Sequence, residues 1–263
     1  MDDSNKTRHP TAGELDHGGS DVKTIEIVTH CYAAELPHYA AGLCYQLSSL
    51  VNHPPATCLV VPTVVWCKGD EATAKVIGHF AGSHRLRHIR CDDAARVGRR
   101  AIGRNMAALS TWADLVWFAD CDQCFGPGLL DRLAGLEWPE GASMIYSREI
   151  MIHRDWVTGD AALAKLADGP RLEDFDPAEF VPKRYGRAIG GVQIVRGDFA
   201  REHGYLRDDP AHQRPADRPF ASFADDVAYR RHCEQFGPIV AVDLPGLFRI
   251  RHSRTTHQPD KAT

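Results

Sequence analysis

Short apolar segments alternate with amphipathic helical patterns through the first half of the chain, and this alternation restricts the fold more than any other feature. Four apolar, mostly valine- or leucine-containing stretches predict strands, at 25–29, 58–65, 86–90 and 115–119. Three periodic segments between them predict helices, at 35–50, 70–80 and 94–110. Strand–helix–strand units of this length favour an α/β fold with a mostly parallel sheet that helices cover on both faces.

The second half of the chain is less regular and predicts a mixed continuation of the same sheet. Apolar segments predict strands at 142–152, 189–195, 240–242 and 247–250. Helical patterns occupy 159–167 and 222–236, and segments rich in proline, glycine and charge predict loops at 168–187 and 206–220. Without repeats or a linker, the simplest organisation is a single domain over residues 23–253, with polar flexible tails at 1–22 and 254–263.

Composition and charge exclude several classes of protein. The formal charge of −4 over 263 residues gives no overall basic field for nucleic acid. No apolar run approaches the roughly 20 residues that span a bilayer, and the N-terminus lacks an apolar signal region. Eight cysteines without the spacing of a secreted framework favour free thiols in a reducing compartment. We therefore expect a cytoplasmic protein, either free or peripheral at the inner membrane face.

Two aspartates stand at the end of the fourth predicted strand, in the segment DLVWFADCDQCF. Asp120 and Asp122 follow the apolar run 115–119, and ligands of parallel sheets bind beyond such strand ends. Two half-buried carboxylates cannot both ionise cheaply, and a divalent cation with a substrate phosphate resolves this. The plainer alternative is that one aspartate caps the turn before Gly126 while the other faces water.

The pair Cys121 and Cys124 suggests a zinc or redox site at first sight. Zinc needs four ligands, and no second cysteine pair is spaced to supply them. Since both thiols flank Asp122, we interpret them as small packing residues.

Five segments, taken in order, resemble the GT-A glycosyltransferases, particularly the large family 2 group. The core segment VGRRAIGRNMAALSTWADLVWFADCDQCFGPGLLDRLAG has the family's Gly…Arg-Asn helix, strand, Asp-x-Asp, proline and leucine-rich helix. IEIVTHCYAAELPHYAAGLCYQL is similar to its first strand and nucleotide-binding turn, and AIGGVQIVRGDFAREHGYL to its acceptor-side segment. FADDVAYRRHCEQFG is similar to its acidic helix start, and RIRHS stands where its late metal-binding histidine stands. The resemblance covers residues 24–253.

The resemblance implies a role for each matching residue on the donor side. Asp120 and Asp122 would meet the donor and a Mn²⁺ or Mg²⁺ ion, with His252 as a further metal ligand and His257 as the fallback. His30 and Tyr32 would contact the nucleobase. The alternative is structural: a polar residue at a strand mouth for His252, and a packed aromatic ring in a turn for Tyr32.

Three arginines spaced four apart, Arg96, Arg100 and Arg104, share one face of the predicted helix 94–110. We expect Arg96 and Arg100 to form a solvated basic stripe, and Arg104, beside Asn105, to reach the nucleotide diphosphate.

One departure from the family lies at the end of the second strand. Where the family usually has an aspartate for the uracil or ribose, this chain has Trp66, Cys67 and Lys68, and the nearest acid is Asp70. The identity of the base is therefore open.

Asp225 and Asp226 open the predicted helix 222–236, and the resemblance assigns Asp226 as general base. One carboxylate is explained as a helix cap and the other as a favourable charge at a helix N-terminus. A helix N-terminus favours an ionised, weakly basic carboxylate, which suits an acceptor hydroxyl that loses its proton late. The family's acidic pair implies inversion at the anomeric carbon.

The resulting expectation is a hexosyltransferase-type glycosyltransferase that moves a sugar from a nucleotide diphosphate sugar to an acceptor hydroxyl. A UDP-sugar is the favoured donor, and a GDP-sugar is the alternative. A non-catalytic nucleotide-sugar-binding or carbohydrate-binding protein of the same fold is the rival from another class. A dinucleotide oxidoreductase or a nucleotidyltransferase would need a glycine-rich first loop, which THCYAAE lacks.

Overall fold

The four strands predicted in the first half form one continuous parallel part of a larger sheet. The structure is a computed structural model that describes residues 22–215 and 222–253. In it β1 (Thr24–His30) lies between β2 (Leu59–Cys67) and β4 (Leu115–Ala119), and β3 (Arg87–Cys91) follows β2 at the edge. The tails expected over 1–22 and 254–263 lie outside the described residues, except for Val22.

The second half completes this sheet with a reversal of direction. Among the described residues the sheet has seven strands in the order β10-β6-β9-β4-β1-β2-β3. Strand β9 (Gln193–Arg196) is antiparallel to its neighbours β4 and β6 (Met144–Ser147), whereas β10 (Ile239–Val242) is parallel to β6. The predicted α/β class with a mostly parallel sheet and a mixed second half is therefore confirmed.

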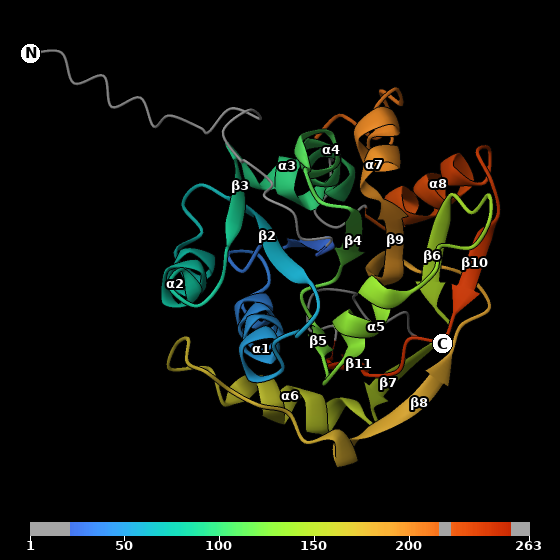
Figure 1. Ribbon diagram of the computed structural model, residues 1–263. Coiled ribbons are helices and arrows are strands. Elements are labelled where there is room, and N and C mark those ends of the chain that lie inside the picture. The colour runs from blue at the N-terminus through green and yellow to red at the C-terminus, as the bar shows by residue number, and fades with distance from the viewer. Residues whose placement is uncertain (1–21, 216–221, 254–263) are drawn as a thin grey trace, which may run out of the picture.

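Helices cover both faces of the large sheet (Figure 1). On one side lie α3 (Ala94–Gly98), α4 (Arg100–Ser110), α7 (Gly197–His203) and α8 (Ser222–Cys233). Helices α1 (His38–Asn52), α2 (Glu71–Phe80) and α6 (Trp156–Ala164) lie on the other side, and α5 (Leu129–Gly135) follows β5. The apolar strand β4 is buried along its whole length because helices cover both of its faces.

A second, four-stranded sheet has the order β5-β11-β7-β8 in the described residues. It consists of β5 (Gln123–Phe125), β7 (Glu149–His153), β8 (Phe180–Arg184) and β11 (Leu247–Arg249). The segment 142–152, predicted as one strand, thus divides between the two sheets. The prediction of an uninterrupted loop over 168–187 was wrong for its last third, where β8 pairs with β7 at the sheet edge.

The helix predicted over 94–110 is broken at Arg99, which has non-helical dihedrals of φ −92° and ψ 89°. Asp93 caps α3 by accepting a hydrogen bond from Arg96 N at 2.8 Å. Asp225 accepts one from Ala101 N at 3.2 Å in the first turn of α4. Because two separate caps start two helices, Arg96 does not share a face with Arg100 and Arg104.

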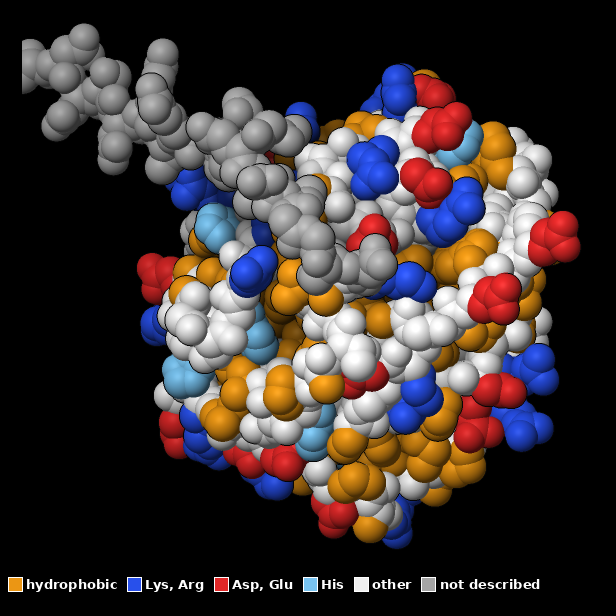
Figure 2. All heavy atoms as spheres, in the orientation of Figure 1, with side chains coloured by type: hydrophobic (Ala, Val, Ile, Leu, Met, Phe, Trp, Pro, Cys, Tyr) orange, Lys and Arg blue, Asp and Glu red, His pale blue; other side chains and the backbone are white. Residues whose placement is uncertain are grey.

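The surface carries mixed charges, and the cysteines lie in the interior. No helix in the described ranges is long and apolar enough to cross a membrane. On the face drawn in Figure 2, acidic and basic side chains are interspersed and do not form a basic stripe. All eight cysteines are buried and free, as expected for a chain without a disulfide framework.

Close contact between α4 and the sheet depends on Gly103. A Cβ at this position would lie 2.4 Å from both His30 Nε2 and Val65 Cγ1. We predict that Gly103→Ala lowers the free energy of unfolding by about 1–3 kcal/mol in urea titrations, because two buried side chains would have to move.

The matched control is Gly78→Ala in α2, where an added Cβ meets nothing within 4 Å among the described residues. Removing a glycine from an open helix position raises stability by up to about 1 kcal/mol. Equal effects of the two substitutions would contradict the close contact assigned to Gly103.

Candidate active site

Asp120 and Asp122 lie in the tight turn that leads from β4 of the large sheet into β5 of the small one. The amide of Gln46 in α1 donates to Asp120 O at 2.9 Å, and Gln123 accepts from Asp120 N at 3.2 Å. Gly42 of α1 approaches Cys121 O so closely that an added Cβ would lie 3.0 Å from it. The turn that holds both carboxylates is therefore held from two sides by hydrogen bonds and packing.

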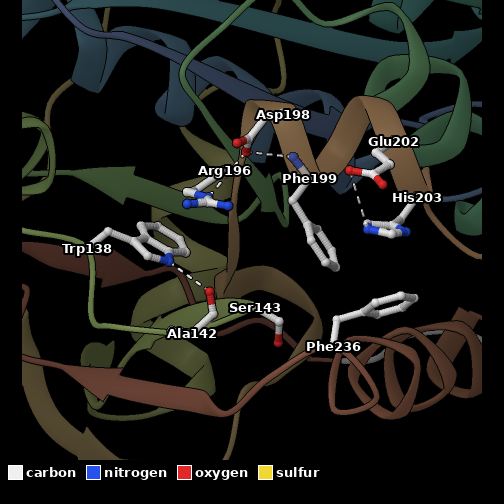
Figure 3. A pocket seen from close by; sticks show the side chains of 10 residues that line it. Trp138, Ala142, Ser143, Arg196, Asp198, Phe199, Glu202, His203 and Phe236 are labelled. Carbon is white, nitrogen blue, oxygen red and sulfur yellow. Dashed lines mark hydrogen bonds and ion pairs between the residues drawn. The ribbon is translucent and has the colours of Figure 1, made fainter.

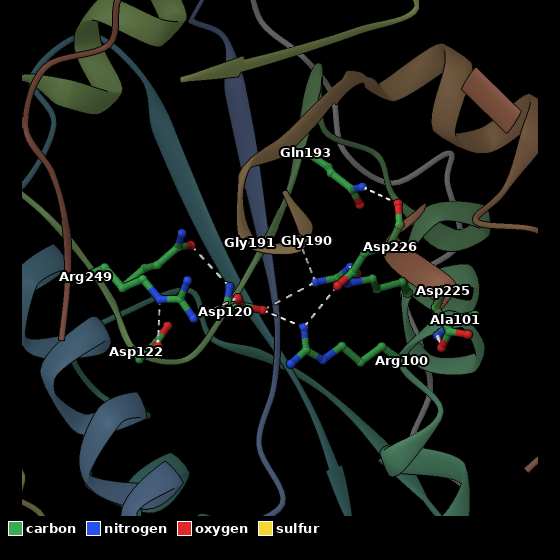
Figure 4. A network of polar contacts seen from close by, with 12 residues as sticks. Arg100, Ala101, Asp120, Asp122, Gly190, Gly191, Gln193, Asp225, Asp226 and Arg249 are labelled. Atoms are coloured by element: carbon green, nitrogen blue, oxygen red, sulfur yellow. Dashed lines mark hydrogen bonds and ion pairs between the residues drawn. The ribbon is translucent and has the colours of Figure 1, made fainter. Parts of the chain in front are cut away.

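Asp122 is buried and pairs with an arginine at the end of strand β11 in the small sheet. Arg249 Nε donates to Asp122 Oδ2 at 2.9 Å, and Arg249 Nη2 lies 3.8 Å from Asp120 Oδ2 (Figure 4). The other oxygen, Asp122 Oδ1, is buried and has no hydrogen-bond partner among the described residues. Asp122 therefore has one oxygen bound to a guanidinium and one that remains available.

Arg100 connects the strand-end aspartates to the helix α8. Its Nη1 donates to Asp120 Oδ1 at 2.7 Å and lies 3.6 Å from Asp226 Oδ2. The prediction that Arg100 belongs to a solvated stripe was wrong: its side chain is 15% exposed. The break at Arg99 is the reason, because it starts α4 with Arg100 facing the end of β4. Arg96, in α3, is exposed as expected.

Arg104 is fully buried and holds Asp226. Its guanidinium donates to Asp226 Oδ1 at 2.6 Å, to the Tyr205 hydroxyl at 2.9 Å and to Gly190 O at 2.9 Å. The diphosphate contact expected of Arg104 stays untested, but these three bonds already use most of its donors. Arg100, which is less enclosed, is the better placed of the two for an anionic ligand.

Two consecutive glycines separate the carboxylates of Asp120 and Asp226. A Cβ on Gly190 would lie 2.0 Å from Asp226 Oδ2, and a Cβ on Gly191 would lie 2.8 Å from Asp120 Oδ2. The segment Gly190–Val192 is a 3₁₀ turn before β9, so the predicted strand 189–195 begins later than expected. These glycines allow the two carboxylates to share Arg100.

Burial and the arginines move the two carboxyl groups in opposite directions. Burial raises the pKa of Asp120, but Arg100, Arg249 and Arg104 outweigh it and hold this pKa below its ordinary value. For Asp226, burial prevails over Arg104 and Arg100, and its pKa is raised. Asp226 is therefore a stronger base than a helix N-terminus alone implied.

Asp225, the neighbour of the candidate base Asp226, stabilises the start of α4. It is fully buried, and its carboxylate accepts from Arg99 Nη1 at 3.0 Å and from Ala101 N at 3.2 Å. His212 Nδ1 lies 2.7 Å from the same carboxylate. The cap expected for the helix of Asp225 itself is thus a cap for α4, supplied from α8.

His30 and Tyr32 follow β1 as expected but are buried in the protein. Both ring nitrogens of His30 lack a hydrogen-bond partner within the described part of the chain, and burial, then Arg104 and Arg100, lower its pKa well below 6.5. Tyr32 is 3% exposed, and its ring lies 4.7 Å from that of Tyr39. A nucleobase contact for either residue stays a prediction.

Asp70, the acid nearest in sequence to the end of the second strand, is buried and occupied in a helix cap. Asp70 is 2% exposed and accepts from both the backbone N and the hydroxyl of Thr73, which caps α2. The departure seen in the sequence therefore persists in the structure.

His252 lies beside Asp122, and its metal role stays a prediction. Its Nε2 is 3.9 Å from Asp122 Oδ2, and its ring is 4.3 Å from that of His38 at the start of α1. Burial, and then His252, lower the pKa of His38 to about 4, so His38 is neutral at pH 7. The fallback residue, His257, lies outside the described residues.

These side chains fit a cation only together with further ligands. In residues 22–215 and 222–253, no group of three or more His, Cys, Asp or Glu could hold a metal ion. A Mg²⁺ or Mn²⁺ ion that also binds a diphosphate needs only one or two protein carboxylates. Asp122 Oδ1, buried and without a hydrogen-bond partner among the described residues, would be the oxygen that such an ion uses. Cys121 and Cys124 are buried packing residues, as predicted.

Two hollows elsewhere lack this chemistry. One, of about 340 Å³, lies between α7 and the end of α8, with Trp138, Phe199 and Phe236 around it (Figure 3). The other, of about 410 Å³, lies between α1, α6 and the segment before β8. Neither contains the aspartates or arginines described above.

The sequence matches no protein-family model and no curated protein. Among solved structures, it is similar to residues 1–349 of S. aureus TarS, with a TM-score of 0.50 and 13% identity over 86% of this chain. Structures of the same protein with UDP and with UDP-GlcNAc have the same TM-score, at 15% and 13% identity. The chain spans about 60% of the 1–349 structure and 36% of the longer TarS chain.

TarS is a GT-A glycosyltransferase, and its strand and helix arrangement matches the one described above. This chain has the GT-A fold. Identities of 13–15% show the architecture alone. Within this GT-A fold, Asp120 and Asp122 lie at the end of β4, and Asp226 lies at the start of α8.

Sequence reasoning missed Arg249 and misjudged Arg100. Arg249 stands in the quoted segment RIRHS, at the end of a strand and three residues before His252, and this position was a usable signal. Tyr205 and Gln193, which hydrogen-bond each other at 2.9 Å beside Asp226, had no sequence signal of their own.

We predict that Asp225→Asn lowers the free energy of unfolding by about 2–4 kcal/mol in denaturant titrations. The substitution removes the charge that compensates the half-buried Arg99, and it weakens the cap of α4. Asp208→Asn is the control, because Asp208 is 89% exposed and its ion pair with Arg207, at 3.6 Å, is too long for a hydrogen bond. A loss below about 0.5 kcal/mol for Asp225→Asn would contradict its role in joining α4 to α8.

Proposed function

We propose that this protein is a glycosyltransferase that moves a sugar from a nucleotide diphosphate sugar, preferably a UDP-sugar, to an acceptor hydroxyl with inversion. One observation carries the proposal: Arg100 contacts both Asp120 at the end of β4 and Asp226 at the start of α8. A single guanidinium thereby lies between a donor-side carboxylate, Asp120, and a candidate base, Asp226. The solved TarS structures with UDP and UDP-GlcNAc support this class of donor.

The donor diphosphate would lie against Asp120, Asp122 and the guanidinium of Arg100. Arginine binds phosphate through two parallel hydrogen bonds, and Arg100 is the partly exposed member of the buried pair. As the bond to the sugar breaks, negative charge grows on the diphosphate, and a preorganised guanidinium stabilises it. Arg104 instead keeps Asp226 in place.

Asp120 and Asp122 would hold a Mn²⁺ or Mg²⁺ ion together with the diphosphate, with His252 as an additional ligand. Such an ion supplies Lewis-acid stabilisation of the departing diphosphate. Asp122 Oδ1 is the oxygen whose buried, unpartnered state within the described chain supports this assignment.

Asp226 would accept the proton of the acceptor hydroxyl. Its carboxylate is held by Arg104 at 2.6 Å, and the amide of Gln193 donates to its backbone carbonyl at 2.9 Å. Because burial raises its pKa, Asp226 accepts a proton more readily than an exposed aspartate does. Direct attack by the acceptor on the anomeric carbon, on the face opposite the leaving diphosphate, would give the inversion that the resemblance of the acidic pair implies.

The test is calorimetric titration of UDP and GDP, each with and without Mn²⁺. We expect one nucleotide to bind at least about tenfold more tightly with Mn²⁺ than without it. Asp122→Asn keeps the shape of the side chain and removes its charge, so it should abolish the effect of the metal. Absence of binding in every condition would contradict the proposal, whereas preference for GDP would reassign the donor.

Activity distinguishes an enzyme from a non-catalytic binding protein of the same fold. We predict that Asp226→Asn lowers the release of UDP from a UDP-sugar by at least about 10²-fold, the usual range for loss of a general base. Nucleotide binding should remain, because Asp226 acts on the acceptor side. Unchanged turnover in the variant would remove Asp226 from the mechanism.

The pH dependence follows from the same carboxyl group. The base acts only when ionised, so kcat/KM falls as the pH drops through the pKa of Asp226. Since this pKa is raised above 3.8, the loss begins at a higher pH than an exposed aspartate would give. A profile that stays flat down to the ordinary aspartate range would show that a different group takes the proton.

A further inference from the structure

Arg249 takes the place of a cation between the two strand-end aspartates. Its Nε is 2.9 Å from Asp122 Oδ2, and its Nη2 is 3.8 Å from Asp120 Oδ2. The Asp122 side chain is 9% exposed, whereas that of Arg249 is 31% exposed. The guanidinium thus lies against Asp122 (Figure 4), and the exposed fraction shows that part of the side chain remains accessible.

The backbone next to Arg249 is held firmly while its side chain has rotatable bonds. Arg249 pairs with Gln123 in the antiparallel ladder of β11 and β5. The next residue, Ile250, donates its N–H to Asp122 O at 2.7 Å. Arg249 can therefore change its ion-pair partner without any movement of the turn that carries Asp122.

A divalent cation at Asp122 must compete with this guanidinium. Asp122 Oδ2 is already bound, and a positive charge within a few ångströms opposes the entry of a second one. Asp122 Oδ1 is available in the described structure, but it is buried beside the same guanidinium. In the free protein, Arg249 therefore lowers the affinity of the site for metal.

A diphosphate removes that obstacle because it binds both partners. Phosphate oxygens accept parallel hydrogen bonds from guanidinium, and they are good ligands for Mg²⁺ and Mn²⁺. When the guanidinium turns to the diphosphate, both oxygens of Asp122 become available.

We propose that Arg249 is a positioning residue that blocks divalent metal binding at Asp122 until a nucleotide diphosphate takes its guanidinium. Metal and nucleotide then bind as a pair, and by linkage each increases the affinity for the other by the same factor. This inference rests on the proposed donor class and adds to it the order in which the site is filled.

The experiment measures Mn²⁺ alone, UDP alone and both together by calorimetry, on the wild type and on Arg249→Gln. We expect the variant to bind Mn²⁺ alone at least about tenfold more tightly, and UDP alone about tenfold less tightly. The factor by which UDP increases Mn²⁺ affinity should fall in the variant. Arg249→Met is a second neutral substitution, and thermal unfolding checks that each variant is folded.

Two controls isolate the charge at this position. Arg249→Lys keeps a positive charge, so its affinity for Mn²⁺ alone should stay closer to wild type than that of Arg249→Gln. Arg184→Gln removes the arginine of an arginine–carboxylate ion pair in the same small sheet, where Arg184 Nε lies 3.1 Å from Glu149 Oε2. This substitution should change neither the affinity for Mn²⁺ nor that for UDP.

Unchanged or weaker Mn²⁺ binding in the two neutral variants would overturn the inference, as would equal tightening in Arg249→Lys. Failure of the proposed function gives a different result, because the wild type would then bind no nucleotide with or without metal. Tighter Mn²⁺ binding in the neutral variants alongside that result would retain the blocking role of Arg249 and reject its diphosphate partner.

Discussion

The site depends on mutual neutralisation between buried carboxylates and guanidiniums. Asp120, Asp122 and Asp226 are each paired with arginine, and Arg100 contacts two of them. A buried carboxylate without a partner would take up a proton, whereas a paired one remains charged. The arginines therefore make it possible to keep several negative charges close together at the end of a buried strand.

The members of this group come from four separate parts of the chain, the turn after β4, α4, α8 and β11, so the fold is what assembles it. Asp120 and Asp122 follow β4 directly. They therefore lie at its carboxyl end, where the parallel strand β1 also ends. Helix α4 presents Arg100 and Arg104 because it begins anew after Arg99. Helix α8 provides Asp226 to the group and Asp225 to the start of α4. Of these two neighbouring aspartates, Asp225 thus stabilises the start of α4, and Asp226 contributes a carboxylate to the site.

Much of the fold followed from local sequence, because β1 to β4 are apolar runs with helical segments between them. The Asp120–Asp122 turn was found for the same reason, since an apolar strand led directly to it. Strand β5 has three residues, too few for a periodic pattern, and β8 lies at an edge where all but its first residue are exposed. Neither segment carries the apolar pattern by which a sequence predicts a strand.

The pairings within the site were beyond local sequence for a different reason. The break at Arg99 coincides with a cap from Asp225, 124 residues after Ala101, so a window over 94–110 shows an uninterrupted helix. The Arg249–Asp122 contact joins residues 127 apart. Gly190 and Gly191 had a strand-like pattern, and their importance became visible only when the carboxylates that they accommodate were in place. Such contacts exist only after the chain has folded.

The distribution of charge also limits how a nucleotide donor can be selected. The arginines and aspartates described above gather where a diphosphate would lie, whereas Asp70, the acid nearest to the end of β2, is occupied in capping α2. In the proposed function, affinity therefore comes mainly from the diphosphate.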